Sequence, residues 1–409
     1  MLSFEEAQSK LDSVNVDSRS EILPLKSPFS SLLGRVLARP VHAISDQPPF
    51  DRATMDGYAV RLDGDRRGFS VVGTVLAGQG FEGPVEPGQA IRIMTGAPCP
   101  RGLTVVPVER TDNGETTVQI EPDALQPGKN IAWQGQDAKE GDAVLSAGCR
   151  LGPATLSSAA MAGARELECF VPPRVSIVTT GDEIGSDGPA GVRNSNGPLL
   201  EAFCASLQVP HDPMHAKDNR RDVETALAAG LERAEIVVTV GGVSMGTHDL
   251  VPSIAESLGF QTLFHHVAMK PGKPLLLAQH PDGTVLLGLP GNPVSVLATA
   301  HLFLAPLIGR FQGGWRPNFL SLPLRQAQEC RGSRRLFQPA QILEGAVEPV
   351  NWNGSGDFYA AAFADGLMEL PPASSCKAGE FVRFMPFLGQ SVGETGLRPG
   401  FDPTAGDCC

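Results

Sequence analysis

The stretch Glu235–Asp249, EIVVTVGGVSMGTHD, decides the fold class of this chain. Its first part, Ile236–Val240, is a run of β-branched residues without a polar face, which is typical of a strand buried on both sides of a parallel sheet. The turn Gly241–Gly246 follows, and a helix-like pattern begins at His248. A strand, a glycine turn and a helix in this order place backbone N–H groups and a helix N-terminus around an anion.

The glycine turn indicates a phosphate-bearing ligand, with a tight strand-to-helix turn that binds nothing as the alternative. Glycines let the backbone approach a ligand closely. The turn lacks both the lysine and the glycine spacing of a Walker loop. Asp249 at its end suits a metal ion that bridges the anion, or a ring N–H donor. The candidate ligand contacts in the turn are Gly241, Gly242, Ser244 and Gly246.

Composition excludes several classes of function. The chain has 409 residues, which predicts roughly two to four domains. A net charge of −12 argues against a general affinity for nucleic acid or anionic membranes. The first residues lack the pattern of a signal peptide, and no apolar run approaches about 18 residues, so we expect a cytoplasmic protein without a membrane span.

The eight cysteines form no C-x-x-C pair, which predicts reduced thiols and argues against a zinc site. Cys408-Cys409 at the C-terminus is either a reactive pair or part of a frayed tail.

Residues 1–43 and 137–170 are predicted to form a discontinuous helical domain. It includes a helix over Ser31–Ala38 that ends before Pro40. An all-β domain at residues 44–136 is expected to interrupt it, because its short β-rich segments are separated by Gly/Pro turns. The expected strands of this domain are Phe69–Val75, Ala90–Met94, Leu103–Val108 and Thr116–Ile120.

Residues 171–313 alternate strand-like and helix-like segments, which predicts a doubly wound α/β domain with a parallel sheet covered on both faces. The expected strands are Val175–Thr179, Ile236–Val240, Leu275–Ala278 and Val285–Leu289. Residues 314–392 return to short strands and are expected to form a small β-barrel, with a sandwich as the alternative. Residues 393–409 have the composition of a disordered tail. The fold class is therefore multidomain α/β plus β.

Polar side chains gather where ligands of an open α/β sheet bind, beyond the carboxyl ends of the strands. Thr180–Glu183 and Pro290–Asn292 each follow a predicted strand, and Asp218 precedes a helix. The rigid turn Lys270–Pro274 holds two lysines about three residues apart, which suits an oxyanion. The alternatives are a helix cap for the acids and a solvated turn for the lysines.

Two further motifs lie in the β-rich region, at Asp56-Gly57 and Thr95-Gly96. Both combine a turn signal with a polar side chain, and taken alone they favour loop structure over a binding site.

In order along the chain, these motifs resemble those of the molybdopterin molybdenumtransferase family (MoeA), which includes the C-terminal domain of gephyrin. The resemblance covers roughly residues 3–390, and the ordered set is far more specific than any single motif. The matching stretches are Phe50–Asp51, Met55–Val60, Ile91–Ala97, Thr180–Glu183, Ser195–Asn196, Gly241–Gly246 with Asp249, Lys270–Pro274 and Gly288–Ser295.

The resemblance implies a homodimer of four-domain chains that takes adenylylated molybdopterin and molybdate as substrates. With Mg²⁺ the family inserts molybdenum into the pterin dithiolene and releases AMP. Because the dithiolene holds the metal, no cysteine cluster is needed. Implied partners are a molybdopterin adenylyltransferase and proteins that mature molybdoenzymes. The alternatives are a non-catalytic pterin-binding scaffold and a divergent paralogue that uses tungstate.

The resemblance also assigns roles to single residues. The catalytic roles fall on Glu183, Asp56, Thr95 and Asp182. The metal ligands are Glu183, Asp249 and Asp218. The substrate contacts are Gly241, Gly242, Ser244, Gly246, Asp218, Asp249, Lys270, Lys273, Pro290, Asn292, Arg334 and Ser355. A shift of one residue in the alignment moves the arginine role from Arg334 to Arg335.

The chain departs from the family pattern at three places. Arg52 adds a cation near the expected site, Asn194 stands where the family usually has an aspartate, and Thr247 before His248 replaces an acid. These changes bear on substrate preference and metal affinity, and they leave the expected fold unchanged.

Overall fold

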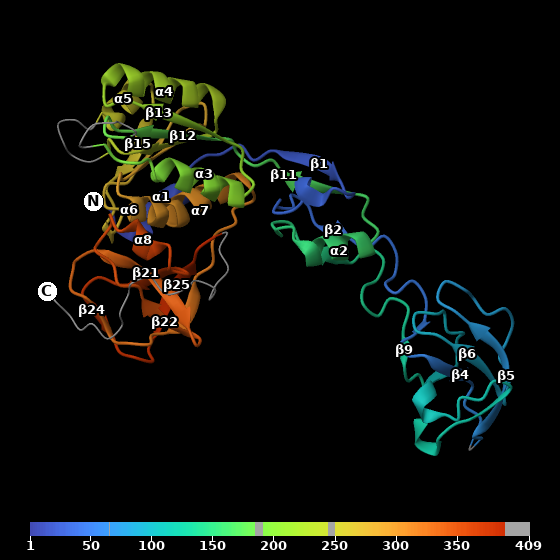
Figure 1. Cartoon of the computed structure of the whole chain (residues 1–409). Helices are drawn as coiled ribbons and strands as arrows, with labels where there is room; N and C mark the ends of the chain where they lie inside the picture. The colour runs from blue at the N-terminus through green and yellow to red at the C-terminus, as the bar shows by residue number, and fades with distance from the viewer. Residues whose placement is uncertain (65, 185–190, 244–249, 389–409) are drawn as a thin grey trace. The chain divides into compact units, whose positions relative to one another are not determined.

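The computed structural model describes residues 1–64, 66–184, 191–243 and 250–388. The chain divides into two compact units (Figure 1). The larger unit consists of Met1–Glu21, Gly34–Ala38 and Cys169–Cys409, and the smaller unit of Ile22–Leu33 and Arg39–Glu168. The fold is multidomain α/β plus β, as the sequence predicts. The four domain boundaries given above stay predictions.

A six-stranded sheet forms the centre of the larger unit, in the order β13-β12-β14-β18-β17-β15. Its strands are β12 (Val175–Thr180), β13 (His211–Ala216), β14 (Ile236–Val240), β15 (Gln261–His265), β17 (Leu276–Gln279) and β18 (Val285–Leu289). Neighbours among β13, β12, β14 and β18 are parallel. Every residue of β12, β14 and β18 is buried, as expected of strands covered on both faces.

The expectation of a wholly parallel sheet is wrong at one edge, where β17 runs antiparallel to β18 and β15 antiparallel to β17. A short turn over 280–284 joins β17 to β18, and His280 N–H donates to Thr284 O at 2.8 Å within it. A parallel pair needs a crossover of about a dozen residues or more, so this connection permits only an antiparallel pair.

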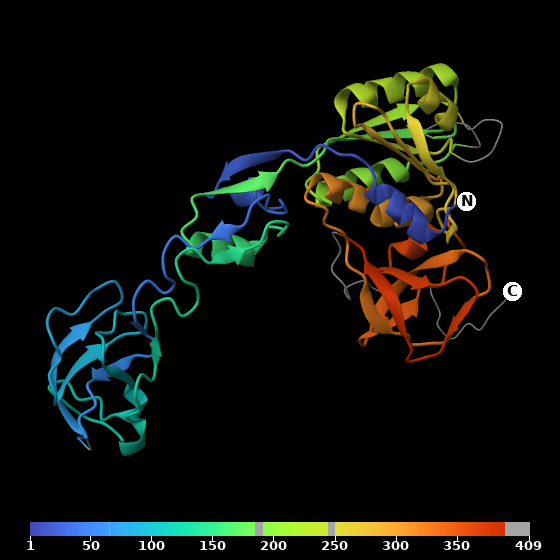
Figure 2. The same cartoon turned by 180° about the vertical axis from the view of Figure 1, so that it is seen from behind.

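Helices cover both faces of the sheet, which confirms the doubly wound arrangement (Figures 1 and 2). One face carries α4 (Arg220–Arg233) and α5 (Val251–Ser257). The other carries α1 (Phe4–Asp12), α3 (Asn196–Ser206), α6 (Pro293–Thr299) and α7 (Ala305–Phe311). Successive residues of β12 pack into cores on opposite faces of the sheet. Val178 packs in the cluster with Leu227, and Ile177 in the cluster with Leu200.

The segment Pro293–Phe311 is long and apolar enough to cross a membrane by length and composition, but 89% of it is buried in this structure. It consists of α6, the π-helical turn Ala300–Leu304 and α7. This burial identifies it as a core helix. Polar residues such as Thr299 and His301 interrupt its apolar run.

His301 is completely buried in this helix and is neutral. Its Nδ1 lies 2.8 Å from Leu297 O and donates to it, while Nε2 accepts from Leu388 N–H at 3.0 Å. The rings of Phe203 and Phe387 each lie 4.9 Å from the imidazole. Burial lowers the pKa of His301 from 6.5 to about 4.

The larger unit continues into a second six-stranded sheet, in the order β16-β21-β23-β25-β19 with β22 paired to β21. Its strands are β16 (Met269–Lys270), β19 (Leu320–Pro323), β21 (Arg335–Leu343), β22 (Ala346–Pro349), β23 (Gly366–Leu370) and β25 (Phe381–Pro386). Nearby lie β20 (Gln328–Cys330), β24 (Ser374–Cys376) and α8 (Phe358–Ala361). An isolated bridge joins Leu324 to Val347. The small β-barrel expected here stays a prediction.

A buried carboxylate joins α1 to this second sheet. The Glu369 side chain is 2% exposed and forms ion pairs with Arg335 and Arg383. Arg335 also pairs with Glu5 of α1, and the ring of Phe4 lies 4.9 Å from that of Phe337. Charges buried in this way must be paired, because an isolated buried ion costs several kcal/mol.

The smaller unit contains a five-stranded sheet in the order β7-β4-β6-β5-β8. Its strands are β4 (Gly57–Val60), β5 (Gly68–Val75), β6 (Gln89–Ile93), β7 (Thr104–Pro107) and β8 (Thr117–Gln119), so the four strands expected here are confirmed. Short pairs join β2 (Val41–His42) to β10 (Ala143–Leu145) and β3 (Arg52–Ala53) to β9 (Ile131–Ala132). The unit also contains α2 (Pro153–Met161), and β1 (Ser20–Pro24) pairs with β11 (Glu166–Phe170).

The helix expected over Ser31–Ala38 is wrong. The chain forms a 3-10 turn over Phe29–Ser31 and then a bridge between Leu37 and Cys169. Gly34 has a φ of 76°, which is a left-handed conformation that ends a right-handed helix. The isolated 3-10 turns elsewhere are Val108–Arg110 and Pro122–Ala124.

We expect His301 to make the unfolding free energy depend on pH. Its pKa is lower in the folded than in the unfolded chain, so its contribution is present above pH 6.5 and is lost as the pH falls toward about 4. The loss approaches about 3 kcal/mol, at about 1.4 kcal/mol per pH unit. Chemical denaturation at several pH values should show a smaller loss for His301→Gln. An unchanged pH dependence in that variant contradicts the assignment.

Replacing the buried carboxylate should destabilise the larger unit. Glu369→Ala leaves Arg335, whose side chain is 17% exposed, without its buried partner, so we expect a loss of about 3 kcal/mol in unfolding free energy. The matched control is Glu344→Ala, because Glu344 pairs with Arg325 at 2.9 Å but is 85% exposed. Denaturation curves that coincide for the two variants argue against this role.

Candidate functional site

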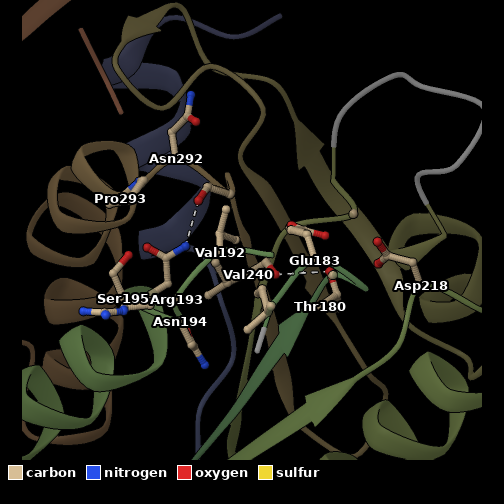
Figure 3. A pocket seen from close by; sticks show the side chains of 16 residues that line it. Thr180, Glu183, Val192, Arg193, Asn194, Ser195, Asp218, Val240, Asn292 and Pro293 are labelled. Carbon is tan, nitrogen blue, oxygen red and sulfur yellow. Dashed lines mark hydrogen bonds between the residues drawn. The ribbon is translucent and has the colours of Figure 1, made fainter. Parts of the chain in front are cut away.

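The strand order places a crevice between the carboxyl ends of β12 and β14. The chain passes from β12 to β13 on one side and then returns to β14 on the other, which is a topological switch point. Ligands of open α/β sheets bind at such points. A pocket of about 470 Å³ lies there, lined by the segments that follow β12, β14 and β18 and by the starts of α3 and α6 (Figure 3). We call it the switch-point pocket.

Two glycines of the predicted turn line this pocket. Gly241 and Gly242 have φ values of 90° and 63°. The N–H of Gly241 donates to Leu289 O at 3.1 Å, and Thr180 Oγ1 donates to Val240 O at 3.2 Å. These bonds hold the ends of three strands together. The first of these bonds occupies the Gly241 N–H.

Three of the expected contacts, Ser244, Gly246 and Asp249, lie outside the described residues, as does the departure at Thr247-His248. Cys408-Cys409 also lies outside them. Among the positions after β18, Asn292 lines the pocket, whereas Pro290 does not.

Three acids lie at the ends of β12 and β13, and two of them line the pocket. Glu183 lies over Gly181, where an added Cβ would be 2.6 Å from Glu183 Oε1. Asp218 and Glu183 line the pocket on the same side (Figure 3). Asp182 braces the two loops, because Asp218 N–H donates to Asp182 Oδ1 at 3.1 Å and Asp182 N–H to Asp218 Oδ2 at 3.4 Å.

These carboxylates fit a hard divalent cation such as Mg²⁺. Burial raises the pKa of Asp218, and the negative charges of Glu183 and Asp182 raise it further. A bound cation relieves this crowding of like charges. Within the part of the chain that the structure describes, no three metal-ligating side chains converge. Mg²⁺ usually keeps several waters and takes one or two carboxylates, so Glu183 and Asp218 are the described residues that would hold it.

The opposite wall of the pocket carries polar and cationic groups, with Arg193, Ser195 and Asn292 at that side in Figure 3. Arg193 is not among the residues predicted from the sequence, although its place two residues before the matched Ser195-Asn196 pair is a signal that points to it. Asn194 accepts from Gly197 N–H at 2.9 Å and so supports the start of α3. An aspartate oxygen accepts such a bond equally well, so this departure preserves the local structure.

Ser355 of the C-terminal region reaches the pocket wall. Asn292 Nδ2 donates to Ser355 Oγ at 2.9 Å, and Val294 N–H donates to Ser355 O at 3.1 Å. Ser355 therefore lies at the start of α6, next to a pocket residue. The sequence predicts that both belong to one site, and the structure brings them together.

Lys270 and Arg334 line a different pocket, of about 490 Å³, which we call the cationic pocket. Its other lining residues are Glu329, Cys330, Arg331, Gly332 and Leu336. Parallel pairing of β16 with β21 brings Lys270 next to Leu336. The two pockets share no lining residue.

The arrangement distinguishes between the two arginines. Arg334 lines the cationic pocket, whereas Arg335 is engaged by Glu369 and Glu5, so the shifted alignment is not supported. Lys273 lines neither pocket, and its carbonyl accepts from Val267 N–H and Leu275 N–H at 3.0 and 2.9 Å. The Lys270–Pro274 turn thus contributes one lysine to a described pocket.

Asp56 and Thr95 are together in the smaller unit. The backbone N–H and the Oγ1 of Thr95 donate to Asp56 Oδ1 at 2.7 and 2.6 Å. The hydroxyl bond, followed by the backbone bond, lowers the pKa of Asp56. Gly57 next to it tolerates no side chain, because an added Cβ would be 1.9 Å from Val106 O. Exposed Arg52 lies on β3.

We expect Gly241→Ala to be destabilising. Its Cβ would lie 2.7 Å from Thr180 Oγ1, at a backbone φ of 90°. The matched control is Gly283→Ala, where φ is 100° and no atom lies within 4 Å. Both variants carry the cost of left-handed backbone, so the difference in unfolding free energy, about 1 to 2 kcal/mol, measures the close contact alone. Equal destabilisation of the two variants rules out that contact.

Comparison with known proteins places these features in a family. The "MoeA N-terminal region (domain I and II)" matches residues 2–163, and the "Probable molybdopterin binding domain" matches residues 176–310. The second match contains the switch-point pocket. Together the two matches span both units of the chain.

Full-length relatives agree with these matches. The molybdopterin molybdenumtransferase of Haemophilus influenzae is 30% identical, over 95% of this chain and 99% of its own. That of a Nostoc species is 32% identical over 83% of each. The molybdopterin biosynthesis MoeA protein of Pyrococcus horikoshii, at 25% identity, superposes with a TM-score of 0.80 over 95% of this chain and 100% of its own. The chain belongs to the molybdopterin molybdenumtransferase family.

Proposed function

We propose that this transferase of molybdenum cofactor biosynthesis inserts molybdenum from molybdate into adenylylated molybdopterin and releases AMP. The observation that carries the proposal is the switch-point pocket, in which Glu183 and Asp218 lie at one side and Arg193 at the other. A ligand with a phosphoanhydride between two heterocycles needs both a cation site and neutral hydrogen-bonding groups. The family matches support the same assignment.

Glu183 and Asp218 would hold Mg²⁺ at the phosphoanhydride. Bound Mg²⁺ supplies a Lewis acid that neutralises the charge developing on the phosphate oxygens. Asp182 keeps Asp218 in place through their reciprocal bonds. The glycines of the β14 turn leave room for the phosphates to approach the backbone. In the smaller unit, Asp56 accepts two bonds from Thr95, and the resemblance gives this pair a catalytic role.

The cationic pocket suits the oxyanion substrate. Lys270, Arg331 and Arg334 line it, although Arg331 is paired with Glu329 at 2.9 Å, and tetrahedral oxyanions are bound by lysine and arginine donors. Molybdate and tungstate have the same charge and shape, so tungstate is the second candidate. The resemblance further supports a homodimer located in the cytosol, and sedimentation of the purified protein tests the oligomeric state.

One incubation tests the proposed reaction against its alternatives. The protein is mixed with adenylylated molybdopterin, Mg²⁺ and either molybdate or tungstate, and AMP release is measured. We expect release that depends on molybdate. A preference for tungstate selects the second candidate. Tight binding of the adenylylated pterin without any oxyanion-dependent AMP release identifies a scaffold and overturns the proposal.

Glu183→Gln should retain the fold and lower molybdate-dependent AMP release by about 100-fold or more. The amide has nearly the same shape but a weaker affinity for a hard cation, so the charge on the phosphates is no longer neutralised. The matched control is Glu232→Gln, on the exposed surface of α4, which should release AMP at the wild-type rate. AMP release at the wild-type rate by Glu183→Gln contradicts the role assigned to Glu183.

A further inference from the structure

The switch-point pocket contains a buried polar atom that has no hydrogen-bond partner among the described residues. Asn196, the first residue of α3, lines the pocket and is 8% exposed. Its Nδ2 donates to Gly291 O at 2.7 Å, whereas its buried Oδ1 has no hydrogen-bond partner among the described residues. Because a carbonyl oxygen only accepts, the bond to Gly291 fixes which end of the amide is nitrogen. The oriented oxygen is therefore an acceptor.

The neighbouring donors of the helix start are already engaged. Gly197 N–H bonds to Asn194 Oδ1 at 2.9 Å, and Leu199 N–H bonds to Ser195 O at 3.2 Å. Buried acceptors are almost always satisfied, and one that is not lowers stability. A native structure tolerates such an atom where a ligand completes the bond. The chemical class that completes this one is an N–H donor.

We propose that Asn196 Oδ1 accepts a hydrogen bond from the amino-bearing edge of a substrate heterocycle and selects rings that carry that amino group. The inference rests on the proposed function, because adenylylated molybdopterin contains two such rings, a pterin and an adenine. The carboxylates of Glu183 and Asp218 lie opposite Arg193 and Ser195 (Figure 3), and the cation would engage them there. Asn196 supplies the acceptor at the start of α3.

The test compares rings with and without the amino group. The first pair of probes is 6-(phosphonooxymethyl)pterin and the matching lumazine, in which a carbonyl replaces the amino group. The second pair is AMP and IMP. Dissociation constants are measured for each probe with the full chain. For the ring bound by Asn196, we expect the wild-type protein to prefer the aminated probe by about tenfold to a hundredfold.

Two variants separate recognition from general damage. Asn196→Ala removes the acceptor and should bring the preference close to one, even if both affinities fall. Asn196→Asp keeps an acceptor oxygen and should retain a preference. The matched control is Asn130→Ala in the smaller unit, because Asn130 Nδ2 also donates to a backbone carbonyl, that of Val105 at 2.8 Å. It should leave the preference unchanged.

Each outcome decides the matter. Loss of preference in Asn196→Ala for the pterin pair, or for the AMP pair, supports the proposal and names the ring. If Asn196→Ala weakens both members of each pair equally, or the wild-type protein binds the probes without preference, the inference falls and the proposed function stands. If no probe binds the wild-type protein, the inference falls, and the AMP-release incubation decides the proposed function separately.

Discussion

The site depends on how closely the ends of β12, β14 and β18 approach one another. Thr180 Oγ1 reaches across to Val240 O, and Gly241 N–H reaches to Leu289 O. This approach requires a residue without Cβ at position 241, since any side chain there would meet the Thr180 hydroxyl. Once the three ends are fixed, the segments that follow them converge, and Glu183, Gly242 and Asn292 line one pocket although they are far apart in sequence.

Strands buried on both faces could be predicted because their sequences consist almost entirely of apolar and β-branched residues, as in Ile236–Val240. The strands β13 and β15 were missed because they lie at the edges of the sheet. His211–Ala216 contains two histidines, an aspartate and a proline, and Gln261–His265 has polar ends. An edge strand has a partner on one side only, so polar residues and proline are tolerated there and the sequence pattern disappears. Gly34 prevented the expected helix because one left-handed residue outweighs good helix formers on both sides.

The candidate site was predictable where a residue's role follows from its neighbours in sequence. Asp182, Glu183 and Gly241 follow strands directly, and their place at the carboxyl end follows from chain direction. Asn196 and Arg334 are different, because tertiary partners decide what they do. Gly291 O orients the Asn196 amide from 95 residues away. Glu369 forms an ion pair with Arg335, and Arg334 is the arginine of the two that lines the cationic pocket.

The joining of α1 to late parts of the chain has a consequence for synthesis on the ribosome. Gln8 Nε2 donates to Leu302 O at 2.7 Å across 294 residues of sequence, and Glu5 pairs with Arg335. At about 5 to 20 residues per second, the first helix waits roughly 15 to 60 seconds for these partners to be made. The smaller unit lies between α1 and these late partners in sequence, so its synthesis is complete much earlier. An amphipathic helix that is left unpaired for this time exposes its apolar face to chaperones and proteases.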